Sequence, residues 1–236
     1  KKLGLIVNPI AGMGGSVGLK GTDGVAAEAA RLGAVRHSGD RAAAALKELL
    51  PFGEEMTVLC ASGEMGESLV KGLGFPHVEC VYETGAETTS DDTKRAAQAM
   101  KDADLLLFAG GDGTARDIFA ALGDKAVAIG IPAGVKIHSP VYAIRPEAAG
   151  KLALKYLEGR CRHTYEAEVV DIDEAAYRDG RVSTSLYGYL TVPDERDYMQ
   201  HGKAPSPVSE HAQQCAIADE MIDRLKPDTY YLVGPG

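Results

Sequence analysis

A short apolar run that ends in a glycine turn limits what this chain can fold into. Residues 105–109, Leu-Leu-Leu-Phe-Ala, are apolar without interruption, which is typical of a strand buried on both faces of a parallel sheet. The run ends in Gly-Gly-Asp-Gly at 110–113, and a helical pattern follows from Thr114 to Leu122. This order predicts that the turn lies at the carboxyl end of a central strand, where open α/β sheets bind their ligands.

The composition of this turn indicates a phosphate site with a carboxylate beside it. Gly110, Gly111 and Gly113 would let the backbone approach a phosphate, and the amides that open the next helix attract anions. Asp112 would repel a phosphate, so we interpret it as a base for a hydroxyl or as a Mg²⁺ ligand. The alternative is a tight turn in which Asp112 only caps the helix. Gly-Gly-Asp-Gly-Thr after a buried strand favours the functional interpretation.

Substitutions follow from this interpretation. Alanine at Gly111 or Gly113 should weaken nucleotide binding, through steric exclusion or through the loss of a positive-φ conformation. Asp112→Asn should lower turnover and keep the fold, because asparagine has the same shape and can still cap a helix.

Three motifs in order give the chain a resemblance to a known superfamily. Residues 110–114, Gly-Gly-Asp-Gly-Thr, resemble the signature shared by NAD kinases, diacylglycerol and sphingosine kinases and, more distantly, phosphofructokinases. Residues 8–12, Asn-Pro-Ile-Ala-Gly, are similar to the Asn-Pro-x-x-Gly turn after the first strand of NAD and lipid kinases. Residues 130–136, Gly-Ile-Pro-Ala-Gly-Val-Lys, look most like the bacterial and archaeal ATP-NAD kinase branch that includes the acetoin-catabolism X proteins.

The resemblance implies a fold, an activity and a set of site residues. NAD kinases have a parallel-sheet, Rossmann-like α/β domain followed by a smaller β-rich domain, and they phosphorylate the adenosine 2′-hydroxyl of NAD with ATP, or another phosphoryl donor, and Mg²⁺. Asp112 would then be catalytic or hold Mg²⁺. The family also implies a homo-oligomer. The nucleotide would be held by residues of the three glycine loops and one helix: Asn8, Pro9, Gly12, Thr93, Gly110, Gly111, Gly113, Thr114, Gly134 and Lys136.

The chain departs from the NAD kinase pattern in two places. NAD kinases carry a further Asn-Asp or Asn-Glu pair that holds the dinucleotide, and Asn8 is the only asparagine of this chain. The usual Gly-Thr-Gly of the third loop is replaced by Pro-Ala-Gly at 132–134. Two alternatives therefore stay open. One is a lipid kinase of the diacylglycerol kinase type, and the other is a non-catalytic nucleotide-binding sensor.

Strands and helices alternate along the first 158 residues, which predicts a parallel sheet covered on both faces. Asn8, Asp112 and Lys136 each follow a different predicted strand, so they can converge only if the three loops share one edge of the sheet. The expected strands are 3–7, 56–60, 78–82, 104–109 and 126–130, and the expected helices are 22–32 (with Thr22 and Asp23 as a cap), 40–50, 64–72, 90–100, 114–122 and 146–158.

The pattern changes near residue 160. Strands at 165–172 and 182–192, joined across Asp179-Gly180, predict an antiparallel hairpin, and residues 209–225 predict a long helix. We therefore place an α/β nucleotide-phosphate domain at 1–158 and a β-rich domain with one long helix at 159–236. Because the chain lacks an initiator Met and its last apolar run ends in a glycine turn, we expect the native protein to continue.

Composition narrows the function classes. The chain has 236 residues, and 45% of them are hydrophobic and 25% charged, as in soluble globular proteins. Its net charge of −9 argues against a nucleic-acid partner. No apolar run approaches the roughly 18 residues of a membrane span, so we expect a cytoplasmic protein without a membrane partner. The four cysteines and six histidines show no metal-ligand spacing.

Three charged residues near the motifs are further candidates. Lys136, on the third loop, could neutralise a phosphate as a point charge. Arg116 is placed unfavourably for the dipole of its predicted helix, so we expect it to face an anion. His138 is the one histidine near the predicted site, so we keep it as a candidate functional residue. The glycine-rich stretch 12–24 matches neither the dinucleotide fingerprint nor the Walker loop, and we interpret it as a phosphate flap.

Overall fold

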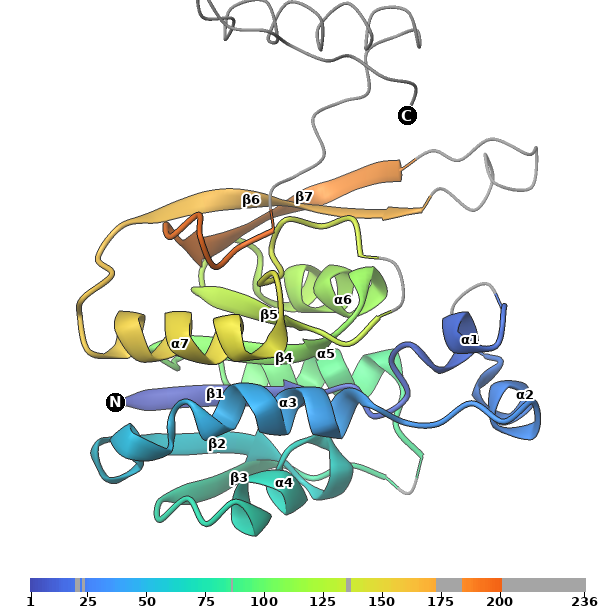
Figure 1. Ribbon diagram of the computed structural model, residues 1–236, viewed down its shortest axis with the longest axis horizontal. Helices are drawn as coiled ribbons and strands as arrows, with labels where there is room; N and C mark the ends of the chain where they lie inside the picture. The colour runs from blue at the N-terminus through green and yellow to red at the C-terminus, as the bar shows by residue number, and fades with distance from the viewer. Residues whose placement is uncertain (20–21, 23, 86, 135–136, 173–183, 201–236) are drawn as a thin grey trace, which may run out of the picture. The chain divides into compact units, whose positions relative to one another are not determined.

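The chain folds around a five-stranded parallel sheet with the strand order β3-β2-β1-β4-β5 (Figure 1). In this computed structural model, residues 1–200 are described except 20–21, 23, 86, 135–136 and 173–183. The predicted α/β class, with a small antiparallel sheet after the parallel one, is confirmed. The five strands are β1 (Lys2–Val7), β2 (Thr57–Ala61), β3 (Val78–Tyr82), β4 (Leu105–Gly110) and β5 (Ala128–Pro132).

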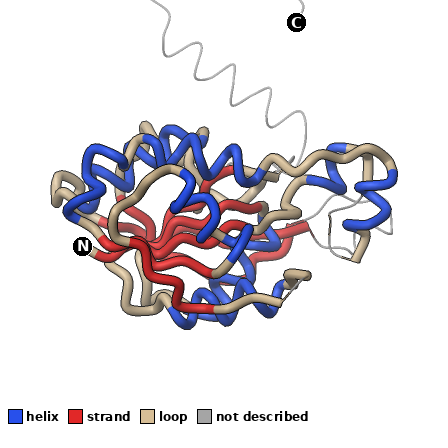
Figure 2. Tube along the Cα trace, turned by 90° about the horizontal axis from the view of Figure 1, so that it is seen from below, coloured by secondary structure: helices blue, strands red, loops and turns tan. Residues whose placement is uncertain are grey.

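Helices cover both faces of this sheet, as Figure 2 shows from below. One face carries α3 (Ser38–Lys47), α4 (Glu67–Gly72) and α7 (Pro146–Leu157), and the other carries α5 (Ser90–Ala99) and α6 (Asp112–Leu122). Coverage on both sides explains why all six residues of β4 are buried. The connections also hold α1 (Met13–Ser16), α2 (Ala26–Arg31) and two 3₁₀ helices, η1 (Leu50–Glu55) and η2 (Gly63–Met65).

The strand order creates a topological switch point between β1 and β4. From β1 the chain moves outward to β2 and β3, and from β4 it moves the other way to β5. In doubly wound sheets, ligands bind outside the carboxyl ends of the strands at such a point. The register places these ends side by side, since Val7 pairs with Ala109 and Gly110 pairs with Pro132. The loops after β1, β4 and β5 therefore leave one edge of the sheet together.

A two-stranded antiparallel ribbon follows the sheet. It consists of β6 (Thr164–Ile172) and β7 (Thr184–Pro193), and its register shifts between Val169 and Val170. The ribbon packs on α6 and β5, and Gly188 leaves room for the ring of Phe119. Residues Lys1–Gly202 form one compact unit. The domain boundary expected near residue 159 stays a prediction.

Several expectations fall outside the described residues or need correction. The hairpin turn at 179–180, the helix at 209–225 and Lys136 lie outside what the structure describes. The expected cap at Thr22 is wrong, because α2 begins at Ala26 and the Thr22 hydroxyl accepts a hydrogen bond from the Gly14 amide at 3.0 Å. No helix among the described residues is long and apolar enough to cross a membrane.

The close crossing of α3 and α7 gives a stability prediction. A Cβ at Gly150 of α7 would overlap the carbonyl oxygen of Ala45 in α3. Gly150→Ala should lower the free energy of unfolding by about 1–3 kcal/mol, the usual cost of overpacking, as measured by urea denaturation. Gly39→Ala is the control, since a Cβ at Gly39 meets nothing within 4 Å. A Gly150→Ala protein as stable as this control would contradict the packing described here.

Candidate functional site

The loops after β1 and β4 are joined by a direct hydrogen bond. Asn8, the residue after β1, donates its side-chain amide to the Thr114 hydroxyl at 3.0 Å. The Asn8 side-chain oxygen accepts the amide of Ile10 at 3.2 Å, which fixes the turn that Pro9 opens. The structure therefore brings Asn8, Pro9 and Thr114 to the same edge of the sheet.

The glycines let the three loops touch one another. Gly12 has a φ of 81°, and a Cβ there would overlap the carbonyl oxygen of Ala133. A Cβ at Gly110 would overlap the Thr114 side chain. Gly111 and Gly134 face each other across the loops after β4 and β5, because a Cβ on Gly134 would lie 3.2 Å from the Gly111 Cα. Bare backbone from three loops thus meets at one place.

The positive-φ part of our expectation for the signature glycines is wrong. Gly111 has a φ of −123° and a ψ of −170°, which other residues adopt readily, and Gly113 is not among the positive-φ glycines. The steric part, exclusion of a ligand by a new Cβ, stays a prediction. In this structure the left-handed conformation is needed at Gly12 of the first loop instead.

Helix α6 begins directly at this meeting point. Its cap is Gly111, whose carbonyl accepts the amides of Thr114 at 2.9 Å and Ala115 at 3.1 Å. The amides of Asp112 and Gly113 come before these, and among the described hydrogen bonds they have no acceptor. Free amides together with the helix dipole favour an anion at this end.

Asp112 is buried, and its carboxylate is turned toward the loop after β5. Its Oδ2 accepts the amide of His138 at 2.8 Å and lies 3.0 Å from Nδ1 of the same residue. Its Oδ1 accepts the amide of Ser139 at 3.0 Å. These donors compensate for the cost of burying the Asp112 carboxylate, whose side chain is only 5% exposed.

Asp112 as a Mg²⁺ ligand stays a prediction. Both of its oxygens face N–H groups of the loop after β5. No group of three or more His, Cys, Asp or Glu among the described residues could hold a metal ion. Because Mg²⁺ is often bound by only one or two carboxylates together with substrate phosphates, the absence of such a group does not decide this role of Asp112.

Two residues that the sequence analysis missed fix this geometry. The buried Ser139 donates its hydroxyl to the Val170 carbonyl of β6 at 2.7 Å and accepts the Val170 amide at 3.1 Å. Tyr142 donates its hydroxyl to the Gly111 carbonyl at 2.5 Å. Burial raises the pKa of Tyr142 well above its usual value, so its hydroxyl stays a donor. The one signal in the sequence for the position of Tyr142 is Gly130, because the Tyr142 ring fills the space that a Cβ at Gly130 would need.

The described contacts of two other candidates from the sequence, Arg116 and Thr93, are with other parts of the protein. Arg116 does not face an open anion site, because its guanidinium lies 3.2 Å from the Asp171 carboxylate and over the Tyr187 ring. It therefore ties α6 to the ribbon. Thr93 is buried in the first turn of α5, and no described hydrogen bond links its side chain to the three loops.

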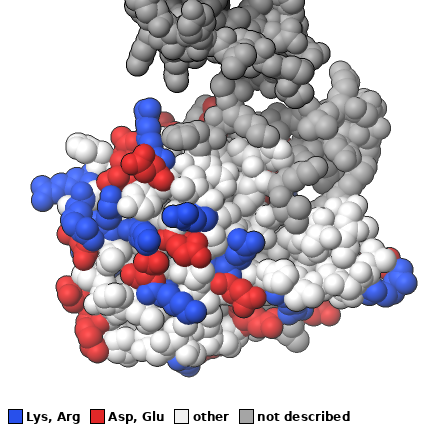
Figure 3. All heavy atoms as spheres, in the orientation of Figure 1, with Lys and Arg blue, Asp and Glu red and all other residues white. Residues whose placement is uncertain are grey.

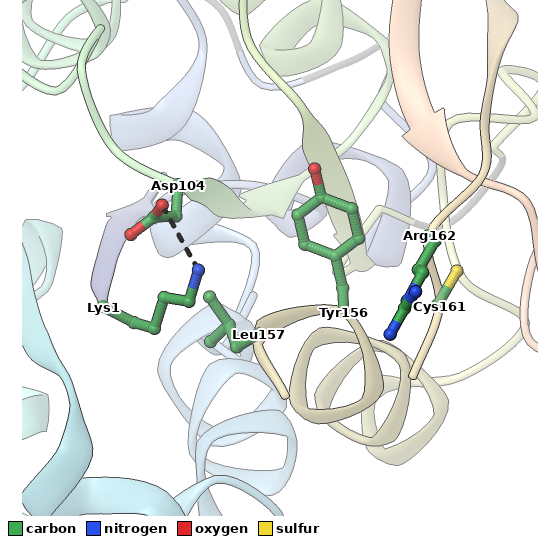
Figure 4. A pocket seen from close by; sticks show the side chains of 6 residues that line it. All are labelled: Lys1, Asp104, Tyr156, Leu157, Cys161 and Arg162. Carbon is green, nitrogen blue, oxygen red and sulfur yellow. Dashed lines mark ion pairs between the residues drawn. The ribbon is translucent and has the colours of Figure 1, made fainter. Parts of the chain in front are cut away.

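A surface hollow on the described part of the chain lies elsewhere. Figure 4 shows it at the amino ends of β1 and β4 and beside the end of α7, where Lys1 lies 3.8 Å from Asp104. None of the predicted site residues lines it, and it is at the opposite edge of the sheet from the glycine loops. Figure 3 shows basic and acidic side chains interspersed on the face that carries α3 and α7. The glycine loops therefore remain the candidate site.

Comparison with known proteins identifies the family. The model of the ATP-NAD kinase N-terminal domain matches residues 3–161, well over half of the chain. The chain belongs to this family. The match includes all three glycine loops, so the predicted ATP-NAD kinase family is confirmed. Membership of a kinase family implies that ATP is a ligand. No curated protein matches the chain.

The chain is also similar, at low identity, to solved structures. Three of them are described as a diacylglycerol kinase, or putative diacylglycerol kinase, from Bacillus anthracis str. Sterne. Each is 20% identical, with a TM-score of 0.35 over 73% of this chain. The match covers 45% of the first and 43% of the other two, so this chain spans less than half of their length.

The hydrogen bonds of Asp112 revise our expectation for Asp112→Asn. Asparagine can replace one oxygen, but its NH₂ group would meet an amide donor of His138 or Ser139. The variant should lose about 1–3 kcal/mol of unfolding free energy in urea denaturation, because a buried donor is left unpaired. The control is Asp124→Asn, at an exposed residue just after α6. Equal stability of the two variants would contradict the described contacts.

Proposed function

We propose that this protein is an ATP-NAD kinase-like phosphotransferase of the branch that includes the acetoin-catabolism X proteins. It transfers a phosphoryl group from ATP, or another phosphoryl donor, to the adenosine 2′-hydroxyl of NAD and so forms NADP. One observation carries the proposal. Three glycine loops converge at the switch point, and the first amides of α6 are free there while the Asp112 charge is turned aside.

Phosphoryl transfer suits such a site because it depends mainly on positioning and on neutralising charge. Mg²⁺ would arrive on the phosphates of ATP, since this ion keeps much of its coordination for water and phosphate oxygens. Asp112 is needed for proton transfer from the hydroxyl, directly or through a neighbour that it holds. In this proposal the phosphates contact the three loops, and the other predicted contacts are kept: Asn8, Pro9, Gly12, Thr93, Gly110, Gly111, Gly113, Thr114, Gly134 and Lys136.

A nucleotide-binding sensor is the second candidate. Its support is that both Asp112 oxygens are engaged by the loop after β5, together with the missing asparagine pair of NAD kinases. A lipid kinase remains the third candidate, because it shares the first two motifs. The predicted homo-oligomer would be compatible with all three functions.

A coupled assay for NADP formation, with NAD, ATP and Mg²⁺, separates these functions. We expect turnover with NAD. In parallel, the melting temperature is measured with ATP, NAD, NADP and diacylglycerol, and diacylglycerol is offered as an acceptor. A melting shift with nucleotide but no turnover would support the sensor instead. Phosphorylation of diacylglycerol in preference to NAD would support the lipid kinase.

Gly111→Ala tests the phosphate site without disturbing the fold. Its backbone conformation is open to alanine, and a Cβ would come no closer than 3.6 Å to any described atom, the Gly134 Cα. The melting temperature should therefore stay unchanged. The affinity for ATP should fall about tenfold or more, which corresponds to a loss of at least ~1.4 kcal/mol of binding free energy. Gly72→Ala is the control, because a Cβ there meets nothing within 4 Å. Unchanged affinity by calorimetry would remove Gly111 from the site.

A further inference from the structure

Tyr142 is a fully buried side chain whose polar end lies at the candidate site. Its ring packs edge-on against Phe108 of β4, with 5.3 Å between the ring centroids, and fills the space beside Gly130 of β5. The Gly130 amide donates to the Val141 carbonyl, and the Ala143 amide donates to the Gly130 carbonyl, so the backbone on both sides of Tyr142 is held by β5. Packing therefore fixes the direction in which the Tyr142 hydroxyl points.

This hydroxyl donates to a peptide group at the start of α6. It lies 2.5 Å from the Gly111 carbonyl oxygen, which also accepts the amides of Thr114 at 2.9 Å and Ala115 at 3.1 Å. The nitrogen of the same peptide group belongs to Asp112, and its N–H has no acceptor among the described hydrogen bonds. In a planar trans peptide the C=O and the N–H point in opposite directions. Three donors thus act on one end of a peptide group whose other end is free at the helix start.

Hydrogen bonds to a carbonyl polarise its peptide group and make the N–H at the other end a stronger donor. In a protein interior this strengthening amounts to roughly 10–30% per bond. Burial, and then the charges of Asp112 and Asp171, raise the pKa of Tyr142 well above its usual value, so the hydroxyl keeps its proton and stays a donor. The helix alone would supply the Gly111 carbonyl with amides only, and Tyr142 adds a further donor to them.

We propose that Tyr142 is a positioning residue for the nucleotide phosphates: its hydroxyl polarises the Gly111–Asp112 peptide, and the N–H of that peptide donates to a phosphate oxygen. This inference rests on the phosphate site of the proposed function. The Asp112 carboxylate keeps its separate role, because it faces the amides of His138 and Ser139 while the backbone N–H of the same residue is free. The effect of Tyr142 therefore falls on phosphate binding.

The test uses Tyr142→Phe, which removes the hydroxyl and keeps the ring. The Gly111 carbonyl still accepts two amides, so no buried polar group is left unpaired and the melting temperature should stay close to that of the unmodified protein. The dissociation constants for ATP and for inorganic tripolyphosphate, measured by calorimetry, should each rise about two- to fivefold. The control is Tyr156→Phe at the hollow on the opposite edge of the sheet, which should change neither constant.

Two further measurements separate polarisation from a merely structural role. In the protein without ligand, the amide nitrogen and proton resonances of Asp112 should move to higher field in Tyr142→Phe, because a hydrogen bond to the preceding carbonyl is lost. Fluorotyrosine in place of Tyr142, with fluorine beside the hydroxyl, is a stronger donor of similar shape. It should bind tripolyphosphate more tightly than the unmodified protein does, which keeps the inference testable if Tyr142→Phe fails to fold.

The outcomes separate this inference from the proposed function. Unchanged affinity for tripolyphosphate in Tyr142→Phe, an Asp112 amide resonance that does not move, or weaker binding with fluorotyrosine would each overturn the inference. A protein whose tripolyphosphate affinity depends on Tyr142 in the expected way, but which forms no NADP, would keep the inference and favour the nucleotide-binding sensor. An unmodified protein that binds neither ATP nor tripolyphosphate would overturn both.

Discussion

The hydrogen bonds between the Asp112 carboxylate and the loop after β5 hold the candidate site together. Asp112 begins α6, yet its charge is buried, and a buried charge requires partners. The amides of His138 and Ser139 supply them, so the loop must fold back onto the start of the helix. Ser139 extends the same constraint to β6 through Val170. One carboxylate thus links the sheet, the helix and the ribbon.

The same contacts resolve an electrostatic conflict. A carboxylate in the first turn of a helix stabilises the helix, but it also opposes any anion that binds there. Turning the Asp112 side chain into the loop keeps the first benefit and leaves the amides of Asp112 and Gly113 available for a phosphate. A polar contact at the cap completes the arrangement, since Tyr142 occupies the Gly111 carbonyl with a hydroxyl that stays protonated.

The fold could be predicted further than the site. Apolar runs and glycine turns are local signals, so β3 agrees with the expected range and β4 and α7 agree within a residue at each end. The contacts that define the site join residues far apart: 26 positions separate His138 from Asp112, and 31 separate Tyr142 from Gly111 and Ser139 from Val170. No spacing rule predicts such pairs. Arg116 illustrates the limit, because the sequence predicts its place in α6 but not its partner, Asp171.

Two different physical reasons explain the glycines of these loops. At Gly110 and Gly12, a Cβ would overlap other parts of the protein, so these positions are required by the packing of the loops alone. At Gly111 the backbone conformation and the space both admit a Cβ, so the fold gives no reason for glycine there. A glycine that the fold does not require, next to free amides at a helix start, is best explained by a ligand that approaches the backbone closely. Gly111 therefore carries more information about function than Gly110 of the same motif.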